Sequence, residues 1–351
     1  MKTDHYISKK GFSLVELLVA MVIFMFVIAA SFSTYITFVN STNRESALAT
    51  MNSDVMIALN LMERDIRMAG FGLPEETRVA SDNNCNVGDE AFCKDNSDRL
   101  FVADGWEILR DFTDNQENDG QIPTSPTDYY SKIADAKSNG GYKASLSSDV
   151  STGATSITLN VLNIDSADER ADPDTPNGED IKDNHALIIA DNTNNHVDGH
   201  RIGTISSNTV NFLSKDPLKN AYLAADSSVV PAIAWYVRKS PGGEKYPDGT
   251  DIYWLYRNET RVIPDIDAFQ IRYGYDAKND GIECDSMIPP QNLKDCNTGS
   301  PTGNNDKPDG RAFSFADLKV IEVQLSVKFM DKREPGKSQI VDYKRSIELR
   351  N

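Results

Sequence analysis

The chain begins with its longest apolar run, Phe12 to Val39, which is interrupted by hydroxyl-bearing residues and by one acid, Glu16. The stretch from Leu17 to Ala30 carries no polar side chain. At about 1.5 Å of rise per residue, a helix over this run is long enough to cross a hydrocarbon layer of about 30 Å. We therefore expect residues 12–39 to form a membrane-inserted helix.

The helical pattern continues beyond this run as an amphipathic segment at residues 40–70. Glu63 and Arg67 stand four apart in the order that supports a helix, and Gly70, Gly72 and Pro74 provide a stop. Apolar residues recur every three or four positions and predict one buried face: Leu48, Met51, Val55, Leu59, Met62, Ile66 and Ala69. A continuous helix over residues 12–69 would be about 85 Å long.

The remainder, residues 71–351, has short β-rich runs separated by Gly, Asn, Asp and Pro. The expected strands are Leu100–Ala103, Ser156–Leu162, Ala186–Ala190, His200–Ile205, Thr209–Leu213, Val229–Arg238, Asp251–Tyr256, Ala268–Tyr275, Val320–Phe329 and Gln339–Leu349. This pattern predicts an α+β fold, with a long amino-terminal helix packed on a mainly antiparallel β head. Residues 138–227 could form an inserted subdomain of that head.

Charges around the apolar run predict its orientation. Lys2, Lys9 and Lys10 precede it, so this end should stay in the cytoplasm while the head crosses the membrane. An ordinary secretory signal, cut near Ala29-Ala30-Ser31, is the alternative. Glu16 argues against that alternative, because an ionised carboxylate in an apolar segment costs roughly 2.5 to 3.5 kcal/mol and a disposable signal has no reason to carry it.

The segment Gly11-Phe12-Ser13-Leu14-Val15-Glu16 resembles the cleavage and methylation motif of type IV pilins and type II secretion pseudopilins. The resemblance implies a leader of residues 1–11, cleavage between Gly11 and Phe12 by a prepilin peptidase, and N-methylation of Phe12. It also implies a salt bridge between Glu16 and the Phe12 amine of a neighbouring subunit. Pairing offsets much of the cost of each buried charge. A protonated Glu16 in a plain single-span anchor is the alternative.

Three further segments resemble the PilW group of minor pilins. They are Met62 to Phe71, Ile266 to Asp276, and the ending Leu349-Arg350-Asn351. The likeness covers the first 75 residues and, more loosely, the last hundred. A GspJ-type pseudopilin shares the amino-terminal pattern but usually has a smaller head. Because a large head is awkward to repeat along a thin shaft, the resemblance implies a place at the tip or in the priming complex of a pilus.

The resemblance also implies a location and partners. The prepilin would lie in the bacterial inner membrane with a periplasmic head, and would then enter a pilus or pseudopilus at the cell surface. Its expected partners are the prepilin peptidase, other major and minor pilins, the inner-membrane assembly platform and membrane lipid. The chain has 36 basic and 53 acidic side chains, a net charge of −17, so no nucleic acid is expected.

Four cysteines form two local pairs in the sequence, Cys85 with Cys93 and Cys284 with Cys296. Short local disulfides are the preferred connectivity in an exported head, and buried free thiols are the alternative. Neither pair has the C-x-x-C spacing of a zinc or redox motif.

Metal and catalytic patterns are weak. Asp276 and Asp280 before Gly281 partly imitate a calcium loop, but Lys278 occupies a ligand position, so a plain acidic turn is favoured and no cofactor is expected. His196 and His200 stand four apart in a stretch that we interpret as a hairpin loop.

Catalytic motifs are also missing from the sequence, so we do not expect an enzyme, although a triad scattered along the chain stays open. The aromatic clusters Trp235-Tyr236 and Tyr253-Trp254-Leu255-Tyr256 could form an adhesive surface. Core packing is the preferred interpretation.

Overall fold

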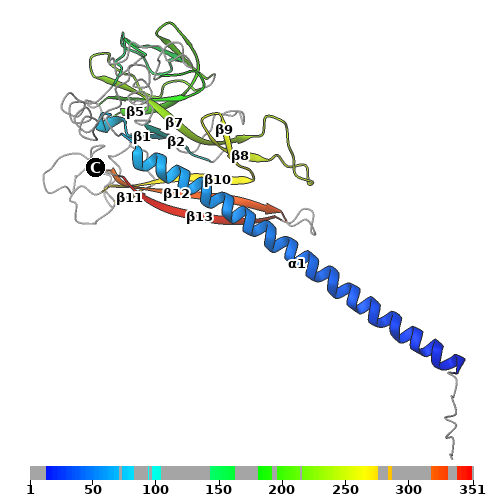
Figure 1. The fold of residues 1–351 in the computed structure, drawn as a ribbon. Helices are drawn as coiled ribbons and strands as arrows, with labels where there is room; N and C mark the ends of the chain where they lie inside the picture. The colour runs from blue at the N-terminus through cyan, green and yellow to red at the C-terminus, as the bar shows by residue number, and fades with distance from the viewer. Residues whose placement is uncertain are drawn as a thin grey trace, which may run out of the picture. The chain divides into compact units, whose positions relative to one another are not determined.

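The computed structural model describes residues 13–70, 73–82, 94, 97–103, 143–162, 181–191, 196–213, 216–275, 284–286, 318–330 and 338–349. It divides into two compact units, Met1–Asp54 and Val55–Asn351, and helix α1 (Leu14–Met68) runs through their boundary. A short 3-10 helix, η1 (Glu75–Thr77), follows α1. The second unit contains the strands (Figure 1).

The described strands form two antiparallel sheets. The larger has the order β1-β2-β7-β4-β5-β6-β3, with β8 paired to β7 and β9 paired to β8; the smaller has the order β11-β10-β12-β13. The strands of the larger sheet are β1 (Val79–Asp82), β2 (Arg99–Ala103), β3 (Ser156–Thr158), β4 (Ala186–Asp191), β5 (His196–Ser206), β6 (Thr209–Phe212), β7 (Ser227–Lys239), β8 (Tyr253–Arg257) and β9 (Thr260–Ile263). Those of the smaller are β10 (Ile266–Tyr275), β11 (Cys284–Ser286), β12 (Leu318–Met330) and β13 (Ser338–Glu348). The predicted α+β class is confirmed.

Every strand expected from the sequence overlaps a strand of the structure. The strands that were not expected are β1, β9 and β11, which have four, four and three residues. The equally short β3 and β6 were found because the expected runs around them, Ser156–Leu162 and Thr209–Leu213, are longer than the strands and show a pattern.

The core lies on both faces of the larger sheet. On the central strand β7, Val230 packs in a cluster with Ile188 and Phe101, whereas the adjacent Val229 packs in another cluster with Leu187 and Ile189. Successive residues point to opposite faces of a strand, so a strand buried on both sides has no polar positions to alternate with apolar ones. This second cluster draws on residues between Ala144 and Val229; the inserted subdomain at 138–227 stays a prediction.

The carboxyl end of α1 has the predicted buried stripe. Val55, Leu59, Met62, Ile66 and Ala69 are buried, and Leu48 and Met51 are half-buried. The helix ends at the predicted stop.

Gly70 provides that stop, because its φ of 73° lies in the left-handed region that suits glycine after a helix.

A buried carboxylate on this stripe holds α1 to the larger sheet. Asp65 Oδ2 accepts hydrogen bonds from Trp235 Nε1 at 3.1 Å and Arg257 Nε at 2.7 Å, and Arg257 Nη2 donates to Asp65 Oδ1 at 3.2 Å. The Asp65 side chain is 3% exposed and that of Arg257 is 28% exposed. We call these three residues the helix anchor, since they join α1 to β7 and β8 together.

The smaller sheet also contacts α1 through polar groups. On β13, Arg345 donates to Asn60 Oδ1 at 2.6 Å and pairs with Glu63 Oε2 at 2.6 Å. Glu63 also pairs with Arg67 four residues later, at 2.8 Å, as the sequence predicted. In Figure 1, β10, β12 and β13 run alongside this end of α1.

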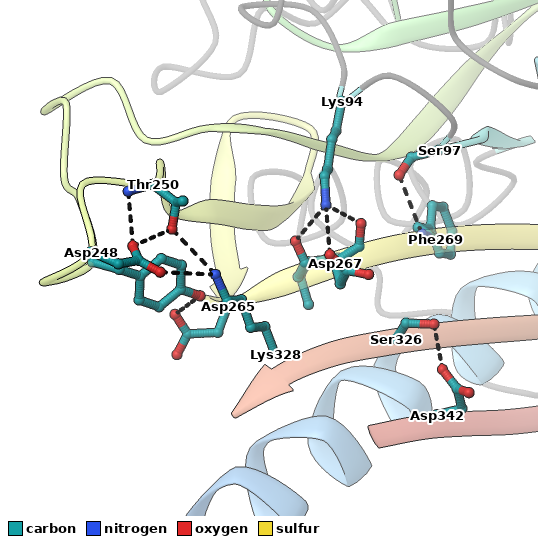
Figure 2. Close-up of polar contacts among 12 residues, drawn as sticks. Lys94, Ser97, Asp248, Thr250, Asp265, Asp267, Phe269, Ser326, Lys328 and Asp342 are labelled. Atoms are coloured by element: carbon teal, nitrogen blue, oxygen red, sulfur yellow. Dashed lines mark hydrogen bonds and ion pairs between the residues drawn. The ribbon is translucent and has the colours of Figure 1, made fainter. Parts of the chain in front are cut away.

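Polar contacts join the smaller sheet to segments that flank strands of the larger one (Figure 2). Lys94 pairs with Asp267 at 3.3 Å, and Ser97 Oγ accepts the N–H of Phe269 at 3.3 Å. On β12, Lys328 donates to Thr250 Oγ1 at 3.2 Å in the loop between β7 and β8. Segments far apart in the sequence are therefore tied together around β10 and β12.

We predict that Gly70→Ala destabilises the head more than Gly153→Ala does. Both glycines have a positive φ, which costs an alanine about 1 to 2 kcal/mol. A Cβ on Gly153 would meet nothing within 4 Å, whereas a Cβ on Gly70 would lie 2.3 Å from Cγ of Arg78. Urea unfolding of the chain in detergent, followed by circular dichroism, measures both losses. Equal losses would contradict the packing role of Gly70.

A second prediction concerns the helix anchor. Asp65→Asn replaces an oxygen that accepts from Arg257 by an N–H donor and leaves the guanidinium without its counter-charge, so we expect a loss of about 2 to 4 kcal/mol in the free energy of unfolding. The control is Asp54→Asn on the same helix, an exposed position where the change should stay within about 0.5 kcal/mol. The same urea titration compares the two variants. A loss no larger than that of the control would show that the helix anchor does not stabilise the head.

Candidate functional site

The described chain begins with a capping box at the start of α1. The Ser13 N–H donates to Glu16 Oε2 at 3.0 Å, and Ser13 Oγ accepts the N–H of Val15 at 3.3 Å. Leu17 N donates to the Ser13 carbonyl at 3.1 Å, which is the first turn of the helix. Both side chains thus satisfy backbone donors that the helix leaves free, and the Glu16 charge lies at the favourable end of the helix dipole.

The sequence interpretation assigned Glu16 only a partner on another subunit. The structure gives it a donor in its own chain, and the signal for that was present in the sequence as Ser13-x-x-Glu16 before an apolar run. Among the described residues, Ser13 is the group that bonds to the Glu16 carboxylate, and it uses Oε2. No described residue donates to the second oxygen, Oε1.

The predicted apolar run is a helix with exposed side chains. Its most apolar window of 18 residues has a mean hydropathy of 2.7, and none of that window is buried. Phe24, Phe26 and Phe38 are 65%, 72% and 68% exposed. Burying such side chains gains about 25 cal/mol for each Å² removed from water, so this surface favours lipid or other apolar helices.

Two threonine hydroxyls in this run bond to the helix itself. Thr34 Oγ1 donates to the Ala30 carbonyl and Thr37 Oγ1 to the Ser33 carbonyl, each at 3.0 Å. This local bond removes the cost of placing a free hydroxyl in an apolar medium. These two polar interruptions of the run are therefore compatible with a membrane.

Several predicted site residues lie outside the described residues. These are Gly11, Phe12, Cys85, Cys93, Cys296, Asp276 and Asp280; of Cys284 only the backbone, in β11, is described. Cleavage, methylation, the disulfides and calcium binding stay predictions.

The interpretation of the histidine stretch as a loop was wrong for His196, which lies on β5. His200 begins the expected strand His200–Ile205, lies on the same β5, and is 1% exposed rather than on a surface loop. Its ring stacks on Phe212 at 4.5 Å between centroids. The strand begins four residues before its expected start, and two of its charged or polar side chains, His200 and Arg201, pair with carboxylates of the head.

That pairing centres on Asp216. Asp216 Oδ1 accepts from Arg99 Nη2 at 2.8 Å, and Asp216 Oδ2 lies 3.6 Å from His200 Nδ1. Burial opposes the Asp216 charge, but Arg99 and His200 outweigh it and hold the pKa of Asp216 well below its usual range. A carboxyl with a lowered folded pKa stabilises the fold above its unfolded pKa, about 3.9, and this stabilisation is lost as the pH falls.

The aromatic clusters pack as predicted. Trp235, Tyr236 and Tyr256 are at most 1% exposed, while Tyr253 and Trp254 are half-buried. The core interpretation is confirmed for the first three.

Residues 7–32 match the family model described as the prokaryotic N-terminal methylation motif. No curated protein matches the chain. The matched segment includes the Ser13–Glu16 capping box and the start of the exposed apolar helix. Together they support a type IV pilin-like prepilin that is anchored in the membrane, processed by a prepilin peptidase and assembled with other pilins. The motif and the α+β fold suggest a structural protein.

Proposed function

We propose that this chain is a minor type IV pilin of the PilW kind, which is cleaved after Gly11, methylated on Phe12 and incorporated at the tip or in the priming complex of a pilus. The observation that carries the proposal is the exposed apolar helix that begins at a methylation motif. An apolar surface that finds no cover in its own chain needs lipid before assembly and neighbouring helices after it.

The proposed docking group is Glu16. Its Oε2 is held by the Ser13 N–H at 3.0 Å, which fixes the carboxylate at the first turn of α1. After cleavage, the amine of Phe12 on a neighbouring subunit would pair with Oε1, and the pairing would offset much of the cost of each charge in apolar surroundings. The register between subunits would follow from this pair.

The position at the tip is supported by the size of the head. The second unit, Val55–Asn351, carries two sheets of nine and four described strands. A head of this size is difficult to repeat along a thin shaft, and the inner-membrane assembly platform would instead use it to begin a filament. A GspJ-like pseudopilin of type II secretion, or a surface adhesin that uses the helix only as an anchor, are the alternatives.

The mature amino terminus tests the class of protein. We expect intact-mass and peptide mass spectrometry of the chain, purified from cells that have the prepilin peptidase, to find N-methyl-phenylalanine at Phe12. In cells without that peptidase, the leader of residues 1–11 should remain. A mature chain that starts after Ala30 or Ser31 would identify an ordinary secretory signal and overturn the proposal.

Glu16→Gln separates docking from capping. Glutamine also serves in a capping box, so α1 should keep its start and the chain should enter the membrane normally. Without the charge, we expect recovery of the variant with other pilins to fall at least about tenfold, since a charge-assisted bond is worth roughly 1.5 to 3 kcal/mol.

The matched control for this experiment is Glu45→Gln, an exposed carboxylate on the same helix that accepts only from Ser41, at 3.4 Å, among the described residues. Affinity purification of a sheared pilus fraction, with blotting for the chain, gives the measurement. Normal recovery of Glu16→Gln would leave Glu16 a capping role alone. If the chain is a free-standing adhesin, the recovery of Glu16→Gln should equal that of Glu45→Gln.

A further inference from the structure

Two arginines lie over stacked tyrosines on one face of the larger sheet. The rings of Tyr236 on β7 and Tyr256 on β8 are nearly parallel, with centroids 5.4 Å apart. The guanidinium of Arg201, on β5, lies 4.2 Å from the Tyr236 centroid, and that of Arg238 lies 4.4 Å from the Tyr256 centroid. We call Arg201 and Arg238 the arginine pair. Stacking on flat rings fixes both guanidinium groups before any ligand arrives.

One carboxylate serves both members of the pair. Glu259 accepts from Arg201 Nη2 through Oε1, and from Arg238 Nη2 through Oε2 at 3.4 Å. Its neighbour Asn258 is bonded to β7 in both directions: Asn258 N donates to the Ala234 carbonyl, and Ala234 N donates to Asn258 Oδ1, each at 2.8 Å. The turn between β8 and β9 therefore holds Glu259 over the pair.

The charges and donors around the pair are not balanced. Two guanidinium groups face one carboxylate, and among the described residues Arg201 Nε and Nη1 have no hydrogen-bond acceptor although they are buried. Burial lowers the pKa of Arg201; Tyr236 and Glu259 oppose this, and Arg238 and Arg99 add to it. Unpaired donors on a buried cation are costly, so another anionic acceptor would stabilise this place.

Exposure shows how such an acceptor could enter. The side chain of Glu259 is 43% exposed and that of Arg238 is 18% exposed, while that of Arg201 is 3% exposed. The nearby pair of Arg99 and Asp216 is different, because both partners are at most 4% exposed. Glu259 can therefore reach water once a ligand takes its place on the arginines, whereas Asp216 cannot.

We propose that the arginine pair is a binding site for an oxyanion, a carboxylate or a phosphate group, and that Glu259 occupies it until the ligand displaces it. The incoming oxyanion accepts from Arg238 at the surface and from Arg201 below it. The tyrosines keep the two guanidinium groups in place during the exchange. This site belongs to the head and does not depend on the proposed role in a pilus.

The test uses the mature full-length chain in detergent and two probes, citrate and inorganic phosphate, titrated at constant ionic strength against chloride. Isothermal titration calorimetry measures each affinity, and the two probes distinguish a carboxylate site from a phosphate site. We expect Glu259→Gln to bind the preferred probe about tenfold more tightly, because the internal competitor loses its charge. Arg238→Gln should bind it about tenfold more weakly.

Two charge-matched controls lie on β13, away from the pair. Lys344→Gln removes a positive charge whose side chain is 53% exposed, and Glu348→Gln removes an exposed negative charge. Neither should change the affinity. The absence of binding by the wild-type chain and Glu259→Gln would overturn the proposal. So would an affinity that is the same in Arg238→Gln as in the wild type, which would mean an adventitious ion only. The comparison of Arg238→Gln with the wild type decides the question even if Glu259→Gln fails to fold.

Discussion

The head depends on a charge placed in the middle of an apolar helix stripe. Asp65 would be expensive there by itself, since its side chain is 3% exposed. The cost is offset because Trp235 and Arg257 together donate three hydrogen bonds to its two oxygens. These donors come from adjacent strands, so α1 can satisfy Asp65 in one register only. The buried apolar side chains from Val55 to Ala69 provide the hydrophobic contact between α1 and the rest of the head. The helix anchor fixes the register in which they pack.

The first unit is under the opposite constraint. Apart from Glu16, its apolar run has no charged side chain, and Thr34 and Thr37 bond to carbonyls of the preceding turn. Its side chains are exposed along the most apolar window. Such a helix is stable in lipid and equally stable among similar helices, because lipid tails and apolar side chains solvate it alike. Exchange between the two environments then costs little, which is the property that a subunit drawn from a membrane into a filament needs.

Patterns in the sequence predicted the helix, its stop and every described strand except β1, β9 and β11, because each depends on a local pattern of residues or on a glycine. The helix anchor was not predictable. Asp65 looks like any exposed helix acid in the sequence, and its partners come 170 and 192 residues later. His196 was misjudged because polar residues near Asn and Asp indicate a loop. The burial of His200 and Arg201 was missed because their partners, Asp216 and Glu259, come later in the sequence. The capping box was predictable from Ser13 and Glu16 alone, and the family resemblance drew attention to the intermolecular role instead.

Helix α1 thus carries two carboxylates in apolar surroundings with different degrees of satisfaction. Asp65 receives bonds on both oxygens within the head. From the described residues Glu16 receives one bond, on Oε2, from a backbone group that every capping box supplies. A carboxylate whose two oxygens both accept hydrogen bonds gains little stability from a second molecule. A carboxylate in lipid that accepts only one bond is stabilised strongly by a cation that pairs with it. The distribution of donors along one helix therefore favours Asp65 as the group that completes the fold, and Glu16 as the group through which the proposed assembly would proceed.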